Sequence, residues 1–193
     1  LLETAFQKKS WQAAPVMFAG NTDVYQPAER QFGITRACLE VFWKYRNPVS
    51  VITKNSLILR DLDLLKQLAS EQLVHVAVSI TTLNEELRQF LEPRTATVAQ
   101  RLKTVEILAA NDIPVFAMLA PIIPGLNEHE ILGMAKAVAD RGALGIGYTL
   151  VRLNGDIGPI FEDWLRKTMP DRADKVLNKI REAHGGNLHD HRP

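Results

Sequence analysis

Short apolar segments alternate along this chain with longer amphipathic segments, and this alternation limits the folds that the chain can adopt. Each apolar segment has the length and composition of a strand that is buried on both faces, as in a parallel sheet. These segments lie at residues 15–19, 49–53, 74–80, in the first half of 113–130, and at 143–152. The helical segments between them favour right-handed βαβ units. The sequence therefore predicts an α/β fold, a partial (β/α) TIM-type barrel of about five parallel strands rather than a doubly wound sheet.

After the last predicted strand, the chain continues into two helical segments. They lie at residues 159–167, where Phe161, Trp164 and Leu165 would pack, and at 170–183. We therefore expect residues 1–153 to form the partial barrel and residues 154–193 to form a helical extension and tail.

Composition excludes several classes of protein. The formal net charge of +1 favours neither a nucleic-acid nor a membrane partner, because a strongly basic surface normally appears in the total. The single cysteine, Cys38, excludes an internal disulfide framework and fits a reducing compartment. No apolar run reaches the length of about 18 residues that spans a membrane, so we expect a cytoplasmic protein with no membrane partner.

Polar residues follow the predicted strands, where parallel strands place them on one rim of the sheet. They occur at residues 21–23, 53–54, 79, 81–82, 127–128 and 148–152. Such a rim could hold a small molecule with an amine, a carboxylate and hydroxyls. For most of these residues, capping of the next helix is an equally good explanation. Lys54 is the exception, because a lysine directly after a buried strand suits an anionic ligand or an amine nucleophile.

The loop in the second half of residues 113–130 lies on this rim. Pro121, Pro124 and Gly125 stop the preceding strand, and Asn127 is a predicted helix cap. Glu128 adds negative charge near the positive end of the helix dipole.

Four blocks in this order carry a family resemblance: GNTDVYQPAER at 20–30, RNPVSVITKN at 46–55, HVAVSITTLNEELRQFLEPRTAT at 75–97, and APIIPGLNEHE at 120–130. Together they resemble the radical S-adenosylmethionine proteins related to spore photoproduct lyase, a branch described as DNA repair photolyase-like. The resemblance covers the chain from about residue 15 onward and implies S-adenosylmethionine as ligand.

The resemblance also assigns residues to that ligand. It implies that Lys54 contacts the carboxylate of the methionine part and that Ser79 contacts the ribose or the carboxylate. It places the amino group at the turn formed by Gly20, Asn21, Thr22 and Asp23.

The adenine would lie against the loop after the fourth predicted strand. Ile123, Gly125 and Glu128 match the second half of the family's G-x-I-x-G-x-x-E motif, and Tyr148 would lie on the strand beside the adenine. Pro121 stands where the first glycine of that motif would be.

Enzymes of this family hold three irons of a 4Fe–4S cluster with cysteines spaced CxxxCxxC, whereas this chain has only Cys38. No cluster ligands are therefore expected in this chain. We expect it to be a carboxyl-terminal portion of a longer enzyme, lacking the first strand and the cluster loop and inactive alone. The parent would use the cluster to cleave S-adenosylmethionine reductively in a lyase-like reaction, with DNA lesions as one candidate substrate.

Two other functions remain open from the sequence. One is a barrel aldolase-type lyase with Lys54 as Schiff-base nucleophile. The other is a non-catalytic domain that binds a nucleic acid or a protein through four cations of one helical segment, Arg30, Arg36, Lys44 and Arg46.

Overall fold

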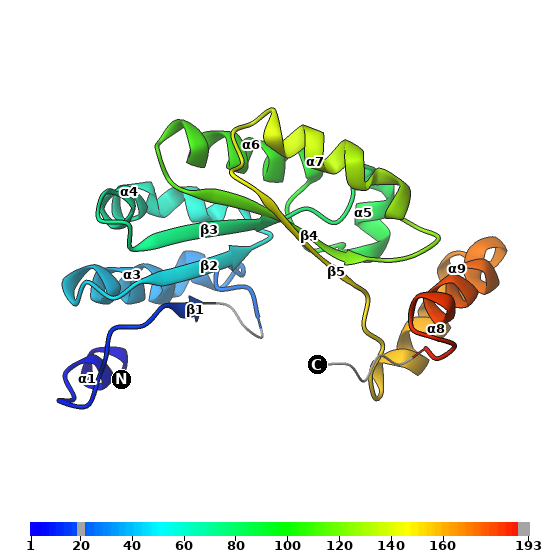
Figure 1. Cartoon of the computed structure of the whole chain (residues 1–193), viewed down its shortest axis with the longest axis horizontal. Coiled ribbons are helices and arrows are strands. Elements are labelled where there is room, and N and C mark those ends of the chain that lie inside the picture. The colour runs from blue at the N-terminus through cyan, green and yellow to red at the C-terminus, as the bar shows by residue number, and fades with distance from the viewer. Residues whose placement is uncertain (19–21, 189–193) are drawn as a thin grey trace.

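The computed structural model describes residues 1–18 and 22–188. Its centre is a sheet of five parallel strands in the order β1-β2-β3-β4-β5. The strands are β1 (Val16–Phe18), β2 (Val49–Thr53), β3 (Val74–Ser79), β4 (Val115–Ile122) and β5 (Ile146–Leu150). Sequence order equals spatial order, so the sheet curves in one direction as an open half-barrel, and the predicted fold class is confirmed (Figure 1).

One face of the sheet forms the main core. Val51, Val76 and Val115 are in register and completely buried beneath the helices. Residues of the opposite parity line the concave face, where Ser50 Oγ lies 2.6 Å from His75 Nε2. Burial on the helix-covered face explains why the strands are recognisable as short apolar runs.

Most helices agree with the sequence pattern, and two differ. The apolar residues from about 27 to 45 recur at mostly helical spacing, which predicts one helix, but the structure divides it into α2 (Glu29–Phe32) and α3 (Ile34–Lys44), because Gly33 has a φ of +61°. The sequence pattern likewise predicts one helix at 57–72, which in the structure begins as the 3-10 turn η1 (Ser56–Asp61) and continues as α4 (Leu62–Ser70).

The remaining elements before the C-terminal helices are α1 (Leu2–Phe6), α5 (Glu85–Leu91), α6 (Val98–Ala110), η2 (Glu128–Glu130) and α7 (Ile131–Ala139). Asn84 caps α5 by accepting a hydrogen bond from the backbone N–H of Leu87. Within residues 1–18 and 22–188, no helix is long and apolar enough to cross a membrane.

The last two helices, α8 (Ile157–Thr168) and α9 (Pro170–Ala183), lie beyond the end of β5 rather than over a face of the sheet (Figure 1). They have an apolar cluster of their own, which also takes in the segments that follow β4 and β5. Its buried members are Ile123, Leu126, Val151, Leu153, Leu165, Ala173, Val176, Leu177 and Ile180. The helices are thereby packed against the carboxyl-end rim of the sheet.

Candidate functional site

A cavity of about 460 Å³ lies at the carboxyl ends of the strands. Its walls come from the segments after β2, β3, β4 and β5, from the end of α5 and from α8. The lining residues are Lys54, Thr81, Leu91, Glu92, Pro121, Ile123, Val151, Leu153, Ile157, Ile160, Phe161 and Trp164. One side of the cavity is therefore charged, and the other sides are apolar and aromatic.

Lys54 and Glu92 form the charged side. Lys54 Nζ lies 2.6 Å from Glu92 Oε1, and the same oxygen accepts a hydrogen bond from the Thr81 hydroxyl at 3.0 Å. The Lys54 side chain is 35% exposed and that of Glu92 only 9%. The ammonium is thus the accessible member of the pair.

Arg101 completes the charged group from behind. Its Nη2 lies 2.7 Å from Glu92 Oε2, and its side chain is almost fully buried. Burial alone would raise the pKa of Glu92, but the charges of Arg101 and Lys54 outweigh it and hold that pKa below its ordinary value. The three side chains together carry a net charge of +1.

Asp23 is a structural carboxylate. Its Oδ1 accepts from the Tyr25 backbone N–H at 2.9 Å and from the Thr53 hydroxyl at 2.7 Å, and its Oδ2 accepts from the Lys54 backbone N–H at 2.7 Å. These bonds fix the end of β2, from which Lys54 projects. Asp23 and Thr22 line a separate hollow of about 230 Å³ next to Cys38. The other two predicted residues of this turn, Gly20 and Asn21, lie outside the described residues.

The loop after β4 brings only part of the predicted adenine site to the cavity. Ile123 lines it, whereas Gly125 and Glu128 do not. Glu128 Oε2 accepts from the Gly125 backbone N–H at 2.7 Å, and its Oε1 pairs with Lys179 of α9 at 2.6 Å. These two contacts hold the pKa of Glu128 below its ordinary value against the raising effect of burial. Their role is to shape the loop.

Asn127, expected to cap a helix, does something different. Its side chain makes no cap at η2 and instead accepts from the Ile123 backbone N–H at 2.6 Å. The sequence pattern does not predict this role, because the hydrogen bond to Ile123 forms only when the loop after β4 is folded.

Ser79 and Tyr148 lie at different places relative to the cavity. Ser79 ends β3 on the concave face, in register with Met118, and its carbonyl accepts from Arg101 Nη1 at 3.1 Å. Tyr148 is in register with Leu119, whose side chain is buried in the helix-covered core, so Tyr148 lies on that opposite face and is 66% exposed. The structure therefore does not bring the Tyr148 side chain to the rim cavity.

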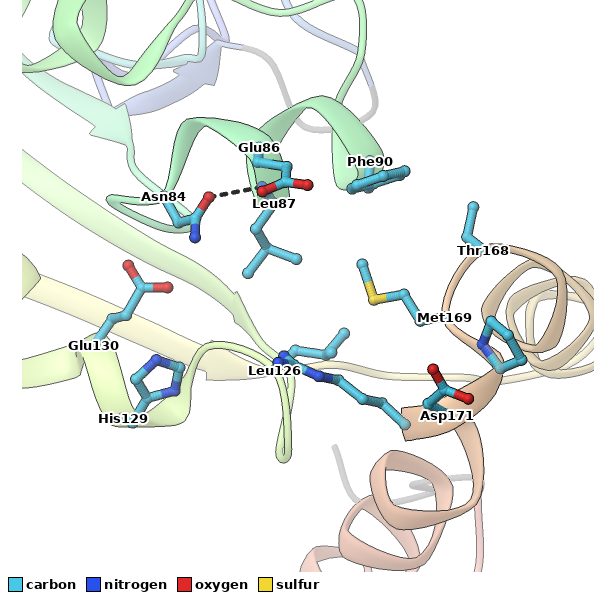
Figure 2. Close-up of a pocket in the computed structure, with 12 residues that line it drawn as sticks. Asn84, Glu86, Leu87, Phe90, Leu126, His129, Glu130, Thr168, Met169 and Asp171 are labelled. Atoms are coloured by element: carbon cyan, nitrogen blue, oxygen red, sulfur yellow. Dashed lines mark hydrogen bonds between the residues drawn. The ribbon is translucent and has the colours of Figure 1, made fainter.

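A second groove, of about 440 Å³, lies between α5, η2 and the turn from α8 to α9 (Figure 2). Leu87, Leu126 and Met169 are among its apolar lining residues. It shares no lining residue with the rim cavity, and no predicted ligand residue of the described chain lines it.

The residues present do not fit a 4Fe–4S cluster. The chain has one cysteine, and burial followed by the charge of Glu29 raises the pKa of the Cys38 thiol. Throughout the part of the chain that the structure describes, no group of three His, Cys, Asp or Glu side chains could hold a metal ion.

Two uncharacterized proteins are similar to this chain in sequence. An uncharacterized protein of Mycobacterium tuberculosis is 30% identical over 189 residues, which cover 95% of this chain and 54% of that protein. An uncharacterized protein of Methanocaldococcus jannaschii is 30% identical over 159 residues, covering 82% of this chain and 58% of that protein. The chain thus spans about half the length of the curated relatives it matches.

Among solved structures, a mutant of spore photoproduct lyase with bound AdoMet and dinucleoside spore photoproduct superposes with a TM-score of 0.64. It shares 14% sequence identity, and the match covers 91% of this chain and 60% of that chain, so the likeness concerns the fold. A model of the Radical SAM superfamily matches residues 5–138, more than half of the sequence. This chain belongs to the radical SAM superfamily.

Proposed function

We propose that this chain is the S-adenosylmethionine-binding part of a radical SAM enzyme and that the rim cavity holds the ligand. One observation carries the proposal: a single cavity joins the Lys54 ammonium to an apolar wall that includes Ile123 and Val151. Lys54 would bind the carboxylate of the methionine part, and the apolar wall would hold the adenine. Ser79, at the end of β3, would contact the ribose or the carboxylate of the ligand.

When bound, S-adenosylmethionine supplies a reactive sulfonium centre. The chain does not supply the three thiolates of a cluster, so we assign it the binding and orientation of this ligand alone. The net charge of +1 on Lys54, Glu92 and Arg101 suits one carboxylate. Asp23 would act indirectly, by fixing the backbone from which Lys54 projects.

For the whole enzyme, we propose a lyase of the spore photoproduct lyase branch that acts on nucleic-acid lesions. The four sequence blocks at 20–30, 46–55, 75–97 and 120–130 support this. Phe161 and Trp164 of α8 also line the cavity, and aromatic side chains of this kind can stack on a nucleobase.

The other two functions have less support from the contacts. Lys54 is engaged as an ammonium with Glu92, whereas a Schiff base requires a free amine. Of the four cations proposed to bind a nucleic acid, Arg36 pairs with Asp61 and Asp63, Lys44 with Glu3, and Arg46 with Glu71.

Calorimetric titration of the chain with S-adenosylmethionine tests the proposal. Lys54→Gln should weaken binding by about tenfold or more, because one charge-assisted hydrogen bond contributes about 1.5–3 kcal/mol. Lys136→Gln, on the exposed side of α7, is the matched control and should bind like the wild type. Failure of the wild type to bind at about 5 mM, above the 1 mM Kd that corresponds to about −4 kcal/mol, would overturn the assignment.

A further inference from the structure

We infer that Glu92 is a positioning residue for Lys54, and that the chain's preference for a ligand carrying a carboxylate depends on it. The inference rests on the proposed function, since it concerns the same cavity. It concerns a residue that follows α5 at the start of the segment Glu92-Pro93-Arg94-Thr95, where the sequence shows only a break between helices.

Glu92 is a rigid partner. Its Oε1 accepts from the Thr81 hydroxyl at 3.0 Å, and its Oε2 is held by Arg101 Nη2 at 2.7 Å. Arg101 is itself fixed, because its guanidinium donates to the Ser79 and Ala96 carbonyls and to the Thr95 hydroxyl. The carboxylate therefore has one position, set by β3 and by the segment between α5 and α6.

Lys54 is the adaptable partner. Its ammonium ends a flexible four-carbon side chain that is 35% exposed, and it docks on Glu92 Oε1 at 2.6 Å. An ammonium has three donors, and this contact uses one of them. The side chain is thus ordered before a ligand arrives, with donors remaining for the ligand's carboxylate, and pre-ordering of this kind improves affinity.

Arg101 makes the arrangement compatible with an anionic ligand. Glu92 alone would cancel the charge of Lys54 and repel a carboxylate at the same cavity wall. The Arg101 guanidinium on the opposite oxygen restores a net charge of +1. Glu92 can therefore orient Lys54 without removing the attraction for the ligand.

The test compares two ligands, S-adenosylmethionine and its decarboxylated analogue, titrated calorimetrically into the wild type and its variants. Glu92→Gln keeps the side chain's size and removes its charge. We expect it to weaken S-adenosylmethionine binding about two- to tenfold, the cost of ordering one free side chain, and to leave the analogue unchanged. In a Lys54→Gln background, Glu92→Gln should have no further effect on the ratio of the two affinities.

Glu85→Gln is the matched control. Glu85 lies on α5 and does not line the cavity, and its substitution removes an ion pair with the buried Arg88. It should leave both affinities unchanged. If Glu92→Gln fails to fold, Thr81→Val removes one hydroxyl that holds Glu92 and should show the same dependence on the ligand's carboxylate, with a smaller loss.

Each remaining result contradicts the inference. Equal weakening of both ligands would show that Glu92 only maintains the cavity's shape. Unchanged or tighter S-adenosylmethionine binding by Glu92→Gln would show that Glu92 does not orient Lys54 or competes for it. Failure of the wild type to bind S-adenosylmethionine would instead overturn the proposed function, so the two failures can be told apart.

Discussion

Asn127 joins the two strand ends that border the rim cavity, because its Nδ2 donates to the Thr81 carbonyl at 2.7 Å. The same nitrogen donates to the Pro121 carbonyl at 3.0 Å, and Oδ1 accepts from the Ile123 backbone N–H at 2.6 Å. The side chain is completely buried. Thr81, Pro121 and Ile123 all line the cavity, so one amide fixes the distance between its polar and apolar walls.

Asn127→Ala should therefore lower the free energy of unfolding by about 2–4 kcal/mol, because it leaves buried backbone groups without partners. Asn127→Asp should also destabilise, since a carboxylate cannot donate to the two carbonyls. Urea unfolding measures both effects. Asn178→Ala, on the exposed side of α9, is the control and should change the value by less than about 0.5 kcal/mol. Equal effects of Asn127→Ala and Asn178→Ala would refute this role.

Gly125 and Gly155 allow backbone strain to be separated from crowding. Both have positive φ, +89° and +60°, but a Cβ on Gly155 would meet no atom within 4 Å. A Cβ on Gly125 would lie 3.0 Å from Val176 Cγ2 and 3.1 Å from Val176 Cα on α9. Gly155→Ala should thus cost about 1–2 kcal/mol from strain alone.

Gly125→Ala should cost about 1–3 kcal/mol more than Gly155→Ala, because α9 must move away from the loop. Thermal unfolding followed by circular dichroism compares the two variants. Equal losses would mean that the packing of α9 on this loop contributes nothing to stability.

The contrast between Val76 and Glu92 shows how much the sequence could reveal. Val76 belongs to a central strand that has a parallel neighbour on each edge and helices over one face. Such burial leaves a local apolar run in the sequence, and this run predicts both the strand and the topology. Glu92 contacts Lys54 and Arg101 across distances of many residues, and no local pattern encodes those contacts. The fold was therefore predictable, whereas the ion-pair partners in the cavity were not.

Tyr148 and Gly33 show two further limits. The presence of β5 in the sheet was predictable from its apolar run. The face of the sheet on which Tyr148 lies depends on its register with Leu119, which the sequence does not specify. Gly33 stands inside an amphipathic pattern that continues on both sides of it, and only the backbone angle shows that the helix is divided there. Lys54 lines the cavity, and its place on the rim depends only on where β2 ends.

Arg101→Met should destabilise the chain strongly. It removes one partner of a buried ion pair and leaves the Glu92 carboxylate under-compensated, a change that costs about 3–5 kcal/mol in comparable sites. Urea unfolding at neutral pH measures the loss. The control is Arg166→Met on α8, whose ion pairs with Glu162 and Asp174 are largely exposed and contribute at most about 1 kcal/mol. A loss for Arg101→Met no larger than for Arg166→Met would show that Glu92 does not depend on Arg101.

The low pKa of Glu92 predicts how stability depends on pH. Because the folded-state pKa lies below the ordinary value of 4.5, the unfolded chain binds more protons at Glu92 than the folded chain does between these two values. Stability from this group is thus complete above about pH 4.5 and is lost as the pH falls through the folded-state pKa. Glu92→Gln removes this contribution, so its unfolding free energy should decline less steeply with acid than that of the wild type, by up to about 1.4 kcal/mol per pH unit.

Urea unfolding of both proteins over a series of pH values gives the difference directly. Between about pH 6 and pH 8, where the carboxyl group is ionised in both states, the difference between wild type and Glu92→Gln should stay constant. Below about pH 4.5 the two curves should converge, because protonation then removes from the wild type the same charge that the substitution removes. Curves that remain parallel into acid would mean that the pKa of Glu92 is the same in the folded and the unfolded chain, so that its contacts with Lys54 and Arg101 do no more than offset the effect of burial.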